Sequence, residues 1–503
     1  MIFRDWLKEL DYTLLQGSVD VETEDVIYDS RKAAPGKVFV AMKGIRVDGH
    51  SFIPQVLKAG VRVLVTERPV EEELKNSGLS EDELKQVTVV MVEEGRHALA
   101  LLSAARFDHP AKKLVMIGVT GTKGKTTTTH MIRAILLAAG KKVGMIGTTG
   151  TVIGDVVTPT LNTTPESYEL HQAFAQMVEA GCEYAVMEVS SQGIKMHRTD
   201  GLYFNYAIFT NISPDHIGPG EHADFEEYLY YKTRLLNMCG IGLVNKDDEH
   251  APQIIKAANC ELYTYSEESK EADFVASDIR YVSQPDFVGT EFHISGKYDM
   301  EVRLGIPGLF NVVNALAAVS VCSFLGLDQA RISHALENIR VNGRMEIVYT
   351  SERCTVLVDY AHNAVSMESL LSTLRDYKPK RLVCVFGCGG NRSKDRRYSM
   401  GEIGGKLADL SIITADNSRY EKVEDIIADI RGSIEKTGGS FIEIPDRREA
   451  IRYSIIQAQP GDMIAVIGKG HEDYQEIKGV KYPMDERVLI AEVLDELKEK
   501  NVR

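Results

Sequence analysis

The sequence predicts an α/β fold divided into three domains, and three observations support this prediction. A chain of 503 residues exceeds what one hydrophobic core usually organises. From about residue 110 onward, short apolar runs alternate with segments of helical period, as in parallel βαβ units. A second series of this kind begins near residue 355 and indicates a separate Rossmann-like domain. We therefore expect domains over residues 1–109, 110–340 and 341–503.

Each expected domain has its own strand pattern. The first is a smaller mixed α/β unit with strands predicted at 37–41 and 61–65. The central domain is expected to be a doubly wound parallel sheet of the P-loop ATPase-like kind, with a helix at 126–139 and strands at 114–120, 184–189 and 206–210. The last domain has strands predicted at 355–360, 381–386, 411–414 and 463–468. Such sheets bind their ligands at the carboxyl ends of the strands.

Composition and charge exclude several classes of protein. With 44% hydrophobic and 26% charged residues, the chain has the composition of a soluble globular protein. A net charge of −15 argues against nucleic acid or an anionic membrane as the main partner. The first ten residues include acidic side chains where a signal peptide would be apolar, and no later run is long enough to span a bilayer. We expect a cytoplasmic protein without membrane insertion.

The cysteines predict neither disulfides nor a zinc centre. The chain has seven, an odd number, and none forms a C-x-x-C pair. Cys384 and Cys388 lie four residues apart, but no second pair or nearby histidine completes a zinc-ligand set. We expect reduced thiols and no cysteine-based structural zinc.

A glycine-rich loop follows the first strand of the central domain and opens a helix. Glycines allow backbone amides to approach phosphates, and the start of a helix favours negative charge. Lys125 is expected to reach the β- and γ-phosphates and Thr126 to bind magnesium. Val119 stands where a strict motif has glycine, so the loop is a close variant, and a turn with merely solvated lysines is the alternative. The candidate ATP-binding residues here are Gly121, Thr122, Lys123, Gly124, Lys125, Thr126 and Thr127.

Two neighbouring strand ends carry further polar residues. Glu188 and Ser191 follow one strand, and His216 follows another. Magnesium takes mostly oxygen ligands, so Glu188 fits with Thr126, whereas His216 suits a second, less strictly oxygen-bound ion. Each residue alone is more often a helix cap or an ordinary strand end. Their convergence at one sheet edge favours a catalytic site that includes Lys125.

Taken together and in this order, the motifs resemble the Mur ligase family, and within it the MurE type, over essentially the whole chain. Asp29-Ser-Arg31 and the run Gly44 to His50 are similar to the family's UDP-binding segment, and Thr120 to Thr126 resembles its ATP loop. The resemblance implies that the first domain binds UDP. It implies contacts to the UDP-sugar-peptide substrate from Ser30, His50, Thr163, Thr164, Ser191 and Arg198.

Lys232 closes the run Phe225-Glu-Glu-Tyr-Leu-Tyr-Tyr-Lys232, which resembles the segment whose lysine is carbamylated in this family. Spacing alone favours a surface lysine on an amphipathic helix. The resemblance instead implies an N6-carboxylysine, formed with carbon dioxide, whose anionic carbamate binds magnesium. It therefore implies two magnesium ions held by Thr126, Glu188, His216 and carbamylated Lys232, and adds Lys232 to the catalytic residues.

Further segments resemble the parts of Mur ligases that contact ATP and the incoming amino acid. The implied ATP contacts are Asn311, Asn314, Arg344, Asp359 and His362. The implied amino-acid contacts are Arg392, Asp416, Asn417, Arg419, Gly468 and Glu472. Ser418 departs from the motif, where enzymes that take meso-diaminopimelate usually have proline. Gln192 likewise stands where the type often has histidine.

The resemblance implies an ADP-forming ligase of peptidoglycan precursor synthesis. ATP would phosphorylate the free D-glutamate carboxylate of UDP-MurNAc-L-Ala-D-Glu, and the amine of a diamino acid would then displace phosphate from the acyl phosphate. We predict meso-diaminopimelate, because the Arg419 guanidinium can bind its distal carboxylate through two hydrogen bonds. If Arg419 instead pairs with a protein carboxylate such as Glu472, it discriminates nothing, and L-lysine or L-ornithine stays open. We expect a monomer.

Three other functions compete with this interpretation. A folylpolyglutamate synthetase-like ligase would share the ATP loop and the acyl phosphate but would not bind UDP. A catalytically inactive, nucleotide-regulated binding protein would not need groups for two metal ions. A dinucleotide oxidoreductase is suggested only by glycines 387, 389 and 390, and Asn391-Arg392 follow where a third glycine would be expected.

Overall fold

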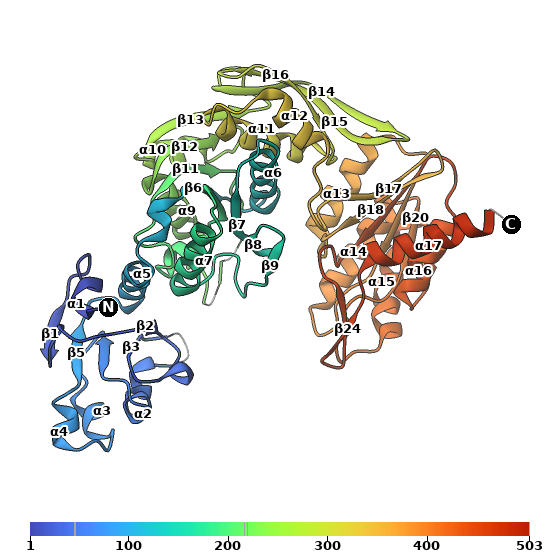
Figure 1. The fold of residues 1–503 in the computed structure, drawn as a ribbon. Helices are drawn as coiled ribbons and strands as arrows, with labels where there is room; N and C mark the ends of the chain where they lie inside the picture. The colour runs from blue at the N-terminus through green and yellow to red at the C-terminus, as the bar shows by residue number, and fades with distance from the viewer. Residues whose placement is uncertain (45–46, 216, 219, 502–503) are drawn as a thin grey trace. The chain divides into compact units, whose positions relative to one another are not determined.

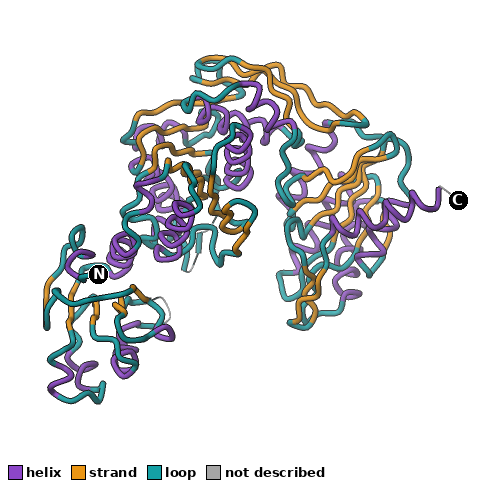
Figure 2. The backbone as a smooth tube through the Cα atoms, viewed as in Figure 1, coloured by secondary structure: helices purple, strands orange, loops and turns teal. Residues whose placement is uncertain are grey.

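The computed structural model describes residues 1–44, 47–215, 217–218 and 220–501, and Figure 1 labels its helices and strands. The chain divides into two compact units. Unit 1 consists of Met1–Asp273 with Ala317–Gly326, and unit 2 consists of Phe274–Leu316 with Leu327–Arg503. Helices and strands alternate through both units (Figure 2), so the predicted α/β class is confirmed.

Unit 1 begins with a five-stranded sheet in the order β1-β5-β4-β3-β2, in which β1 alone is antiparallel to its neighbour. Alternate side chains point to opposite faces. Val38 and Val40 pack in the cluster formed with α1 and α5, whereas Phe39 packs in the cluster formed with α2. The elements are α1 (Phe3–Trp6), β1 (Thr13–Gln16), β2 (Asp25–Ile27), β3 (Lys37–Val40), α2 (Ile53–Lys58), β4 (Val63–Thr66), α3 (Glu71–Lys75), α4 (Glu81–Leu84), β5 (Thr88–Met91) and α5 (Gly95–Arg106).

The second sheet of unit 1 has the order β13-β12-β11-β6-β10-β7-β8-β9. The first six strands are parallel, and β8 and β9 continue the sheet as antiparallel strands. The chain starts at β6 in the middle and extends the sheet in both directions, which confirms the predicted doubly wound arrangement. The strands are β6 (Val115–Thr120), β7 (Val143–Gly147), β8 (Gly150–Ile153), β9 (Val156–Thr158), β10 (Tyr184–Glu188), β11 (Phe204–Phe209), β12 (Cys239–Asn245) and β13 (Glu261–Ser266).

The register of this sheet brings three strand ends to one level. Glu188 lies opposite Val119, and Phe209 lies opposite Thr120. The loops after β6, β10 and β11 therefore leave the sheet at the same edge. The helices of this part of the chain are α6 (Lys125–Ala138), α7 (Ser167–Glu179), α8 (Ser191–Lys195), α9 (Phe225–Thr233) and α10 (Ala251–Ala257).

Unit 2 contains an antiparallel ribbon and a mainly parallel sheet. Figure 2 shows the long ribbon strands, which are β14 (Phe274–Gln284), β15 (Phe287–Gly296) and β16 (Met300–Leu304). Two helices follow, α11 (Leu309–Ser323), which runs into unit 1, and α12 (Gln329–Glu337), which packs on β16. The six-stranded sheet has the order β17-β18-β22-β19-β20-β21, in which only β17 is antiparallel to its neighbour.

The parallel strands of unit 2 match the predicted Rossmann-like domain. The strands are β17 (Glu346–Thr350), β18 (Cys354–Asp359), β19 (Arg381–Phe386), β20 (Leu410–Ile413), β21 (Phe441–Glu443) and β22 (Asp462–Ile467), followed by the hairpin of β23 (Tyr474–Ile477) and β24 (Val480–Pro483). The helices are α13 (Ala364–Asp376), α14 (Lys394–Leu407), α15 (Val423–Thr437), α16 (Arg447–Ile456) and α17 (Glu486–Asn501). Every strand predicted from the sequence is found within two residues at each end.

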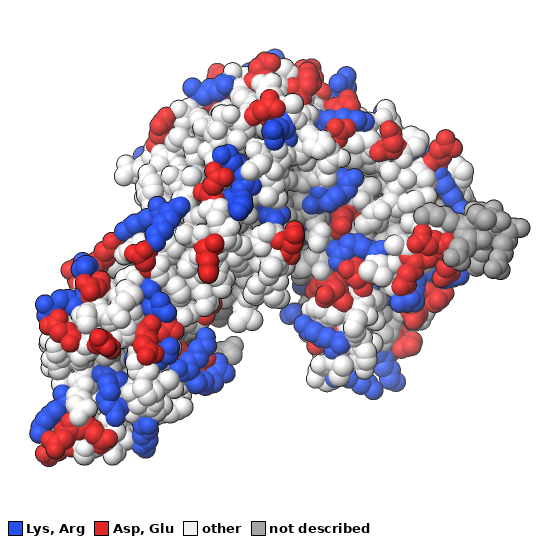
Figure 3. Space-filling view, in the orientation of Figure 1, with Lys and Arg blue, Asp and Glu red and all other residues white. Residues whose placement is uncertain are grey.

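The surface charges and the apolar content of the helices are consistent with the amino-acid composition of the chain. Figure 3 shows basic and acidic side chains interspersed over the visible face of the protein. Within the described part of the chain, no helix has both the length and the apolar content needed to cross a membrane. All seven cysteines are free thiols, as expected.

His171 on α7 is a buried histidine whose two ring nitrogens have no hydrogen-bond partner among the described residues. Burial lowers the pKa of His171 from 6.5 to about 3. The folded protein therefore binds fewer protons than the unfolded chain, and the free energy of unfolding should fall as the pH drops from 6.5 toward 3. At pH 4 this loss is about 3 kcal/mol.

We expect His171→Leu to reduce the stability difference between pH 7 and pH 4 by about that amount. Urea denaturation followed by circular dichroism at both pH values measures it. His334→Leu, at an exposed position of α12, is the control and should keep the wild-type pH dependence. Equal acid sensitivity of wild type and His171→Leu would show that other groups titrate.

Candidate active site

The glycine-rich loop lies between β6 and α6 and is held by residues at the end of β11. Gly121 has a φ of 142°, and a Cβ atom there would lie 1.9 Å from Thr210 Oγ1. The Thr122 amide donates to the Asn211 carbonyl at 2.8 Å, and the Lys123 amide donates to Asn211 Oδ1 at 2.9 Å. Thr210 and Asn211 were not singled out by the sequence analysis, because their role depends on the parallel pairing of β6 with β11.

The start of α6 is shaped for an anion. Its N-cap residue is Gly124, with a φ of 87°, and no side chain caps the helix. The first amides of α6 therefore face the loop without a competing side-chain acceptor. Lys125 Nζ donates to the carbonyls of Gly121 at 2.8 Å and Thr122 at 3.1 Å. The Lys125 side chain therefore folds back against the backbone of the loop.

The structure brings Thr126 and Glu188 together at the sheet edge. Thr126 Oγ1 donates to the Glu188 carboxylate, with 3.0 Å to each oxygen, and Glu188 is only 1% exposed. Thr148, just after β7, also donates to this carboxylate, from its amide at 2.9 Å and its hydroxyl at 3.2 Å. A buried carboxylate beside a hydroxyl is an oxygen-donor pair of the kind that magnesium binds. The sequence analysis did not identify Thr148, because its signal is only its position at a strand end.

Gly147 leaves the space that the Glu188 carboxylate occupies. A Cβ atom on Gly147 would lie 2.3 Å from Glu188 Oε1. Because the sequence analysis predicts that Glu188 binds magnesium and takes part in catalysis, we expect Gly147→Ala to displace the carboxylate, to lower kcat by about 10²-fold and to raise the magnesium requirement. An ångström-scale misplacement of a catalytic group has an effect of this size. Steady-state assays at varied magnesium concentration measure both.

Gly432→Ala is the matched control for this substitution. Gly432 lies in α15, and a Cβ atom there meets no atom within 4 Å. The control should keep full activity and gain up to about 1 kcal/mol of stability, because alanine favours helices over glycine. A fully active Gly147→Ala enzyme would contradict the proposed position of Glu188.

Lys232 is buried, so the alternative of a surface lysine on α9 is wrong. Its side chain is 2% exposed, and Nζ donates to the Gly121 carbonyl at 2.7 Å and lies 4.6 Å from the centre of the Tyr228 ring. Lys125 donates to the same carbonyl. Burial, and then the positive charge of Lys125, hold the pKa of Lys232 well below its usual range. Burial and the charge of Lys125 thus favour the uncharged form of this amine at the phosphate loop.

The residues of this sheet that were predicted to bind the UDP-linked substrate lie around the loop after β10. Thr164 Oγ1 donates to the Glu188 carbonyl at 3.0 Å, and Thr163 Oγ1 lies 3.1 Å from Thr148 Oγ1. Ser191 Oγ lies 2.9 Å from Nε2 of the buried His222. His222 was not predicted as a site residue. His216 lies outside the described residues.

Arg198 connects this loop to the start of α7. It donates to the Thr164 carbonyl at 3.0 Å and forms a 2.8 Å ion pair with Glu166. Arg96 of α5 pairs with the same carboxylate at 3.0 Å. Arg198 thus holds the segment from Thr163 to Glu166 in place.

The two predicted UDP-binding residues differ in their surroundings. Ser30 is half-buried at the start of a short 3₁₀ turn, next to Asp29, whose pKa is lowered to about 2 by its hydrogen bonds with Arg31. His50 is buried, and both of its ring nitrogens are used within the protein. Nδ1 lies 2.6 Å from Asp48 Oδ1, and Nε2 accepts from the Glu67 amide at 3.0 Å. The His50 side chain therefore supports its loop.

In unit 2, the predicted ATP-side residues form a buried polar group. Asn314 Nδ2 donates to Asn311 Oδ1 at 3.2 Å, and Asn311 Nδ2 donates to the Pro307 carbonyl at 2.7 Å. Asp359 accepts from the amides of Met345 and Ala361, both at 2.7 Å. Burial raises the pKa of Asp359 despite these bonds.

The side chains of Arg344 and His362 both lie close to the ring of Tyr360. The Arg344 guanidinium lies 5.0 Å from the centre of the Tyr360 ring, and the His362 ring lies 4.7 Å from it. His362 Nδ1 lies 2.9 Å from the Tyr360 carbonyl, and it therefore carries the proton of that hydrogen bond. A cation, an aromatic face and an imidazole are thus presented together.

Most of the residues predicted to bind the incoming amino acid lie close together, in the loops after β20 and β22. Glu472 accepts from Asn417 Nδ2 at 2.9 Å and from Lys469 Nζ at 3.2 Å. Lys469 also donates to Asn417 Oδ1 at 3.0 Å and lies 3.7 Å from Asp416. Lys469 is fully buried and was not predicted. Gly468 leaves space beside Asp416, because a Cβ atom there would lie 3.2 Å from Asp416 Oδ2.

Arg419 pairs with a protein carboxylate, as the alternative supposed, but the partner is Glu476 and not Glu472. Its Nη1 donates to the Gly390 carbonyl at 2.9 Å, and its Nε lies 3.3 Å from Glu476. The backbone of Arg419 has a φ of 51° and bonds to β23 through the Glu476 carbonyl at 3.0 Å. Arg392 is exposed, with its Cγ 3.9 Å from a Cβ atom built on Gly389. The Arg419 guanidinium is thus held through Nε and Nη1.

A phosphate loop, a buried carboxylate and a buried lysine at one sheet edge define a nucleotide-binding α/β protein equipped for phosphoryl transfer. Three family models match the chain: "Mur ligase family, catalytic domain" over residues 23–107, "Mur ligase middle domain" over 119–322 and "Mur ligase, glutamate ligase domain" over 343–470. Together with full-length relatives of nearly 40% identity, these matches show that the chain belongs to the Mur ligase family, whose members are ATP-dependent ligases.

The relatives are named UDP-N-acetylmuramoyl-L-alanyl-D-glutamate–2,6-diaminopimelate ligases. The one from Caldanaerobacter subterraneus is 39% identical and covers 98% of both chains, and the one from Clostridium perfringens is 38% identical and covers 98% of this chain and all of its own. A solved structure of a ligase with this name is 30% identical, with a TM-score of 0.72 over 95% of both chains. A folylpolyglutamate synthase from Thermotoga maritima, at 17% identity and a TM-score of 0.58 over 74% of this chain, shares the fold.

Proposed function

We propose that this ligase joins meso-diaminopimelate to the D-glutamate side-chain carboxylate of UDP-N-acetylmuramoyl-L-alanyl-D-glutamate, with cleavage of ATP to ADP and phosphate. The observation that carries the proposal is the cluster of Lys125, Thr126, Glu188 and Lys232 at one sheet edge. Relatives that match over their full length carry the name of this reaction. The same ligation with L-lysine or L-ornithine is the second candidate, because Ser418 departs from the usual motif.

The chemistry requires activation of a carboxylate. An amine cannot displace oxide from a carboxylate, but it can displace phosphate from an acyl phosphate. In the first step the substrate carboxylate attacks the γ-phosphorus, and ADP leaves. In the second step the amine attacks the acyl carbon, phosphate leaves, and the amine loses a proton. Catalysis is chiefly positioning and charge neutralisation, because two anions must first approach each other.

Lys125 supplies a cation next to the loop amides that bind the phosphates. The Thr126 hydroxyl and the Glu188 carboxylate fit a magnesium ion, because both are oxygen donors at the end of the phosphate loop. When bound, magnesium would neutralise charge on the phosphoryl oxygens. His216 is the proposed ligand of a second ion.

We propose that Lys232 is carbamylated. Burial favours its uncharged amine, which is the form that attacks carbon dioxide, and the product is a carbamate with release of one proton. This changes a group next to Lys125 from a potential cation into an anion, which removes the repulsion that lowers the pKa of Lys232. The resulting carboxylate-like group would complete the oxygen ligands near Glu188.

The C-terminal site offers charges of both signs to a zwitterionic amino acid. Asp416 and Glu472 are suited to ammonium groups, and Arg419 and Arg392 are suited to carboxylates. In the three-domain division that we propose, over 1–109, 110–340 and 341–503, this site belongs to the last domain. The first domain would bind UDP through Ser30 and the backbone around His50, and Asn311, Asn314, Arg344, Asp359 and His362 would contact ATP.

Product analysis tests the proposal. The enzyme is incubated with ATP, magnesium and UDP-N-acetylmuramoyl-L-alanyl-D-glutamate, and with meso-diaminopimelate, L-lysine or L-ornithine in parallel. We expect phosphate release that depends on the acceptor, and a product whose mass contains diaminopimelate. A preference for lysine or ornithine would keep the ligase and change its substrate. Turnover with a folate and glutamate instead would overturn the proposal.

A further inference from the structure

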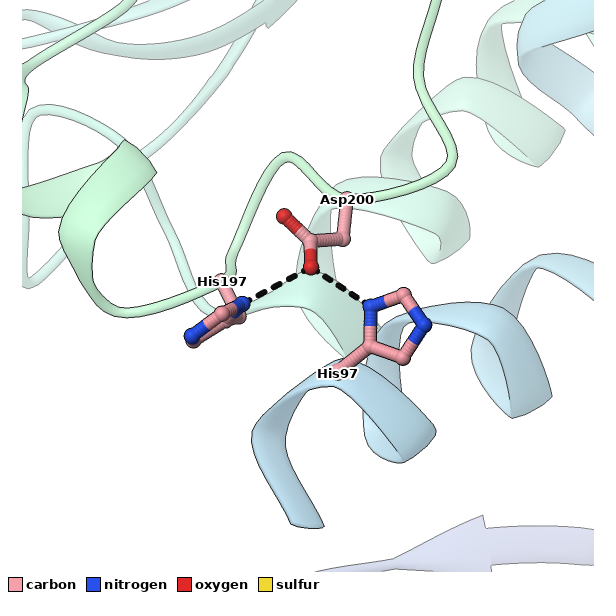
Figure 4. Close-up of side chains that lie close together, drawn as sticks. All are labelled: His97, His197 and Asp200. Atoms are coloured by element: carbon pink, nitrogen blue, oxygen red, sulfur yellow. Dashed lines mark hydrogen bonds and ion pairs between the residues drawn. The ribbon is translucent and has the colours of Figure 1, made fainter. Parts of the chain in front are cut away.

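Two histidines and one aspartate form a cluster away from the phosphate loop. His97 lies in the first turn of α5, and His197 and Asp200 follow α8. His97 Nδ1 lies 2.6 Å and His197 Nδ1 lies 2.8 Å from the same oxygen, Asp200 Oδ2 (Figure 4). One potential ligand atom from each residue lies within 4.8 Å of the others. Segments about one hundred residues apart thus converge on one point.

We propose that His97, His197 and Asp200 form a binding site for a transition-metal ion of the Zn²⁺ type. Two imidazole nitrogens and one carboxylate oxygen are the donors that such ions prefer, whereas magnesium prefers oxygen alone. The site goes beyond the proposed ligase function, which uses none of these three residues. It also differs from the cysteine-based zinc centre that the sequence analysis excluded.

The geometry suits an ion that enters from solvent. The exposed fractions of the His97, His197 and Asp200 side chains are 44%, 37% and 19%, so three protein ligands would leave further positions for water. The ligand nitrogens now donate hydrogen bonds to Asp200. When the ion binds, each ring loses the hydrogen on Nδ1 to solvent. A charged ring then keeps its proton on Nε2, and a neutral ring takes up a proton there, so both rings bind the metal in the neutral form. Ligand atoms about 2.0–2.1 Å from a tetrahedral ion lie roughly 3.3 Å apart, so each nitrogen must move away from Asp200 Oδ2 by about half an ångström or more, which partly exposed side chains allow.

The surrounding charges favour a cation. The carboxylates of Glu94 and Asp11 lie close enough to His97 to act on it electrostatically. The backbone also supports the arrangement. His197 has a φ of 56°, and its amide donates to the Ile194 carbonyl at 3.0 Å, which turns the chain back toward α5 at this point.

The sequence neighbours of both histidines link the cluster to the substrate loop. Arg96 and Arg198 both pair with Glu166, at 3.0 and 2.8 Å, and Arg198 also holds the Thr164 carbonyl. Arg96 and Arg198 therefore meet at the Glu166 carboxylate, and their neighbours His97 and His197 meet at the Asp200 carboxylate. These two carboxylates join α5 to the segment after α8. An ion at Asp200 would strengthen this junction, so metal binding should raise the melting temperature of the protein.

The experiment uses the full chain, freed of metal by a chelator and kept in excess magnesium so that the ligase site is saturated. Isothermal titration with Zn²⁺ is compared for wild type, His97→Gln, Asp200→Asn and the control His334→Gln, whose histidine is exposed on α12. We expect one ion per chain, affinity lowered by about tenfold or more in the two cluster variants, and no change in the control. Melting temperatures without metal show whether each variant is folded.

Cobalt absorption identifies the ligands independently of any variant. Co²⁺ bound to the wild type should show the spectrum of nitrogen and oxygen ligands, without a thiolate charge-transfer band. Absence of binding to the wild type, equal binding by all variants, or a thiolate band would each overturn the proposal, because they would leave the cluster as hydrogen-bonded side chains only. None of these outcomes depends on whether the ligase acts on diaminopimelate.

Discussion

Lys232→Ala should lower kcat by about 10²- to 10³-fold with little change in protein stability at neutral pH, because under the proposed carbamylation it would remove an anionic metal ligand from the phosphoryl-transfer site. Burial, and then the positive charge of Lys125, lower the pKa of the unmodified amine, so the folded protein gains little from its charge. A purely structural lysine would have the opposite signature, with a lower melting temperature and nearly full activity. Steady-state kinetics and thermal unfolding of the same preparation separate these roles.

Chemical rescue makes the test specific for the carbamate. The alanine variant has space for a small carboxylate, and formate or acetate should restore part of the activity by supplying the missing anion. Lys256→Ala, at an exposed position of α10, is the control and should be fully active and insensitive to added carboxylates. In the wild type, isotope-labelled bicarbonate should give a carbamate resonance that is lost in Lys232→Ala. An active alanine variant would contradict the proposed role of Lys232.

The sequence predicts the fold well where burial is strong. Strands such as β6 and β22 are continuous apolar runs, and a parallel strand that is buried on both faces needs this pattern. The hairpin of β8 and β9 and the ribbon of β14 to β16 were not predicted. β9 is exposed along its whole length and β14 over most of its second half, so these strands produce a weaker hydrophobic signal, and their pairing depends on neighbours that the local sequence does not identify.

The sequence predicts only those residues of the site that belong to a recognisable motif. Motifs locate Lys125, Thr126 and Glu188, because phosphate binding needs defined residue types at defined spacing. The supporting residues lack such signals. Thr148 and Asn211 act through tertiary pairing, and many threonines and asparagines elsewhere in the chain have no such role. The burial of Lys232 likewise depends on how α9 packs against the loop, and spacing alone favours a surface position.

Arg419→Ala should lower kcat/KM for meso-diaminopimelate by about 30-fold to several thousandfold, corresponding to roughly 2–5 kcal/mol for one partner of a buried, hydrogen-bonded charge pair. The guanidinium is held through Nε by Glu476 and through Nη1 by the Gly390 carbonyl. Nη2 has no protein partner among the described residues, and we expect it to bind the distal carboxylate together with Nη1. L-lysine has no such carboxylate, so its own low kcat/KM should change by less than about threefold.

Two further variants separate selectivity from folding. Arg431→Ala removes a surface arginine that pairs with Glu443 at 3.1 Å in the same unit, and it should leave both substrates unaffected. Glu476→Gln keeps a hydrogen-bond acceptor for Arg419 Nε, so it should reduce diaminopimelate turnover less than Arg419→Ala does. Competition of the two amino acids for one enzyme measures the selectivity directly. If Arg419→Ala lowers turnover of both acceptors equally, Arg419 positions the loop after β20, and the selectivity must come from Arg392 or from the hairpin of β23 and β24.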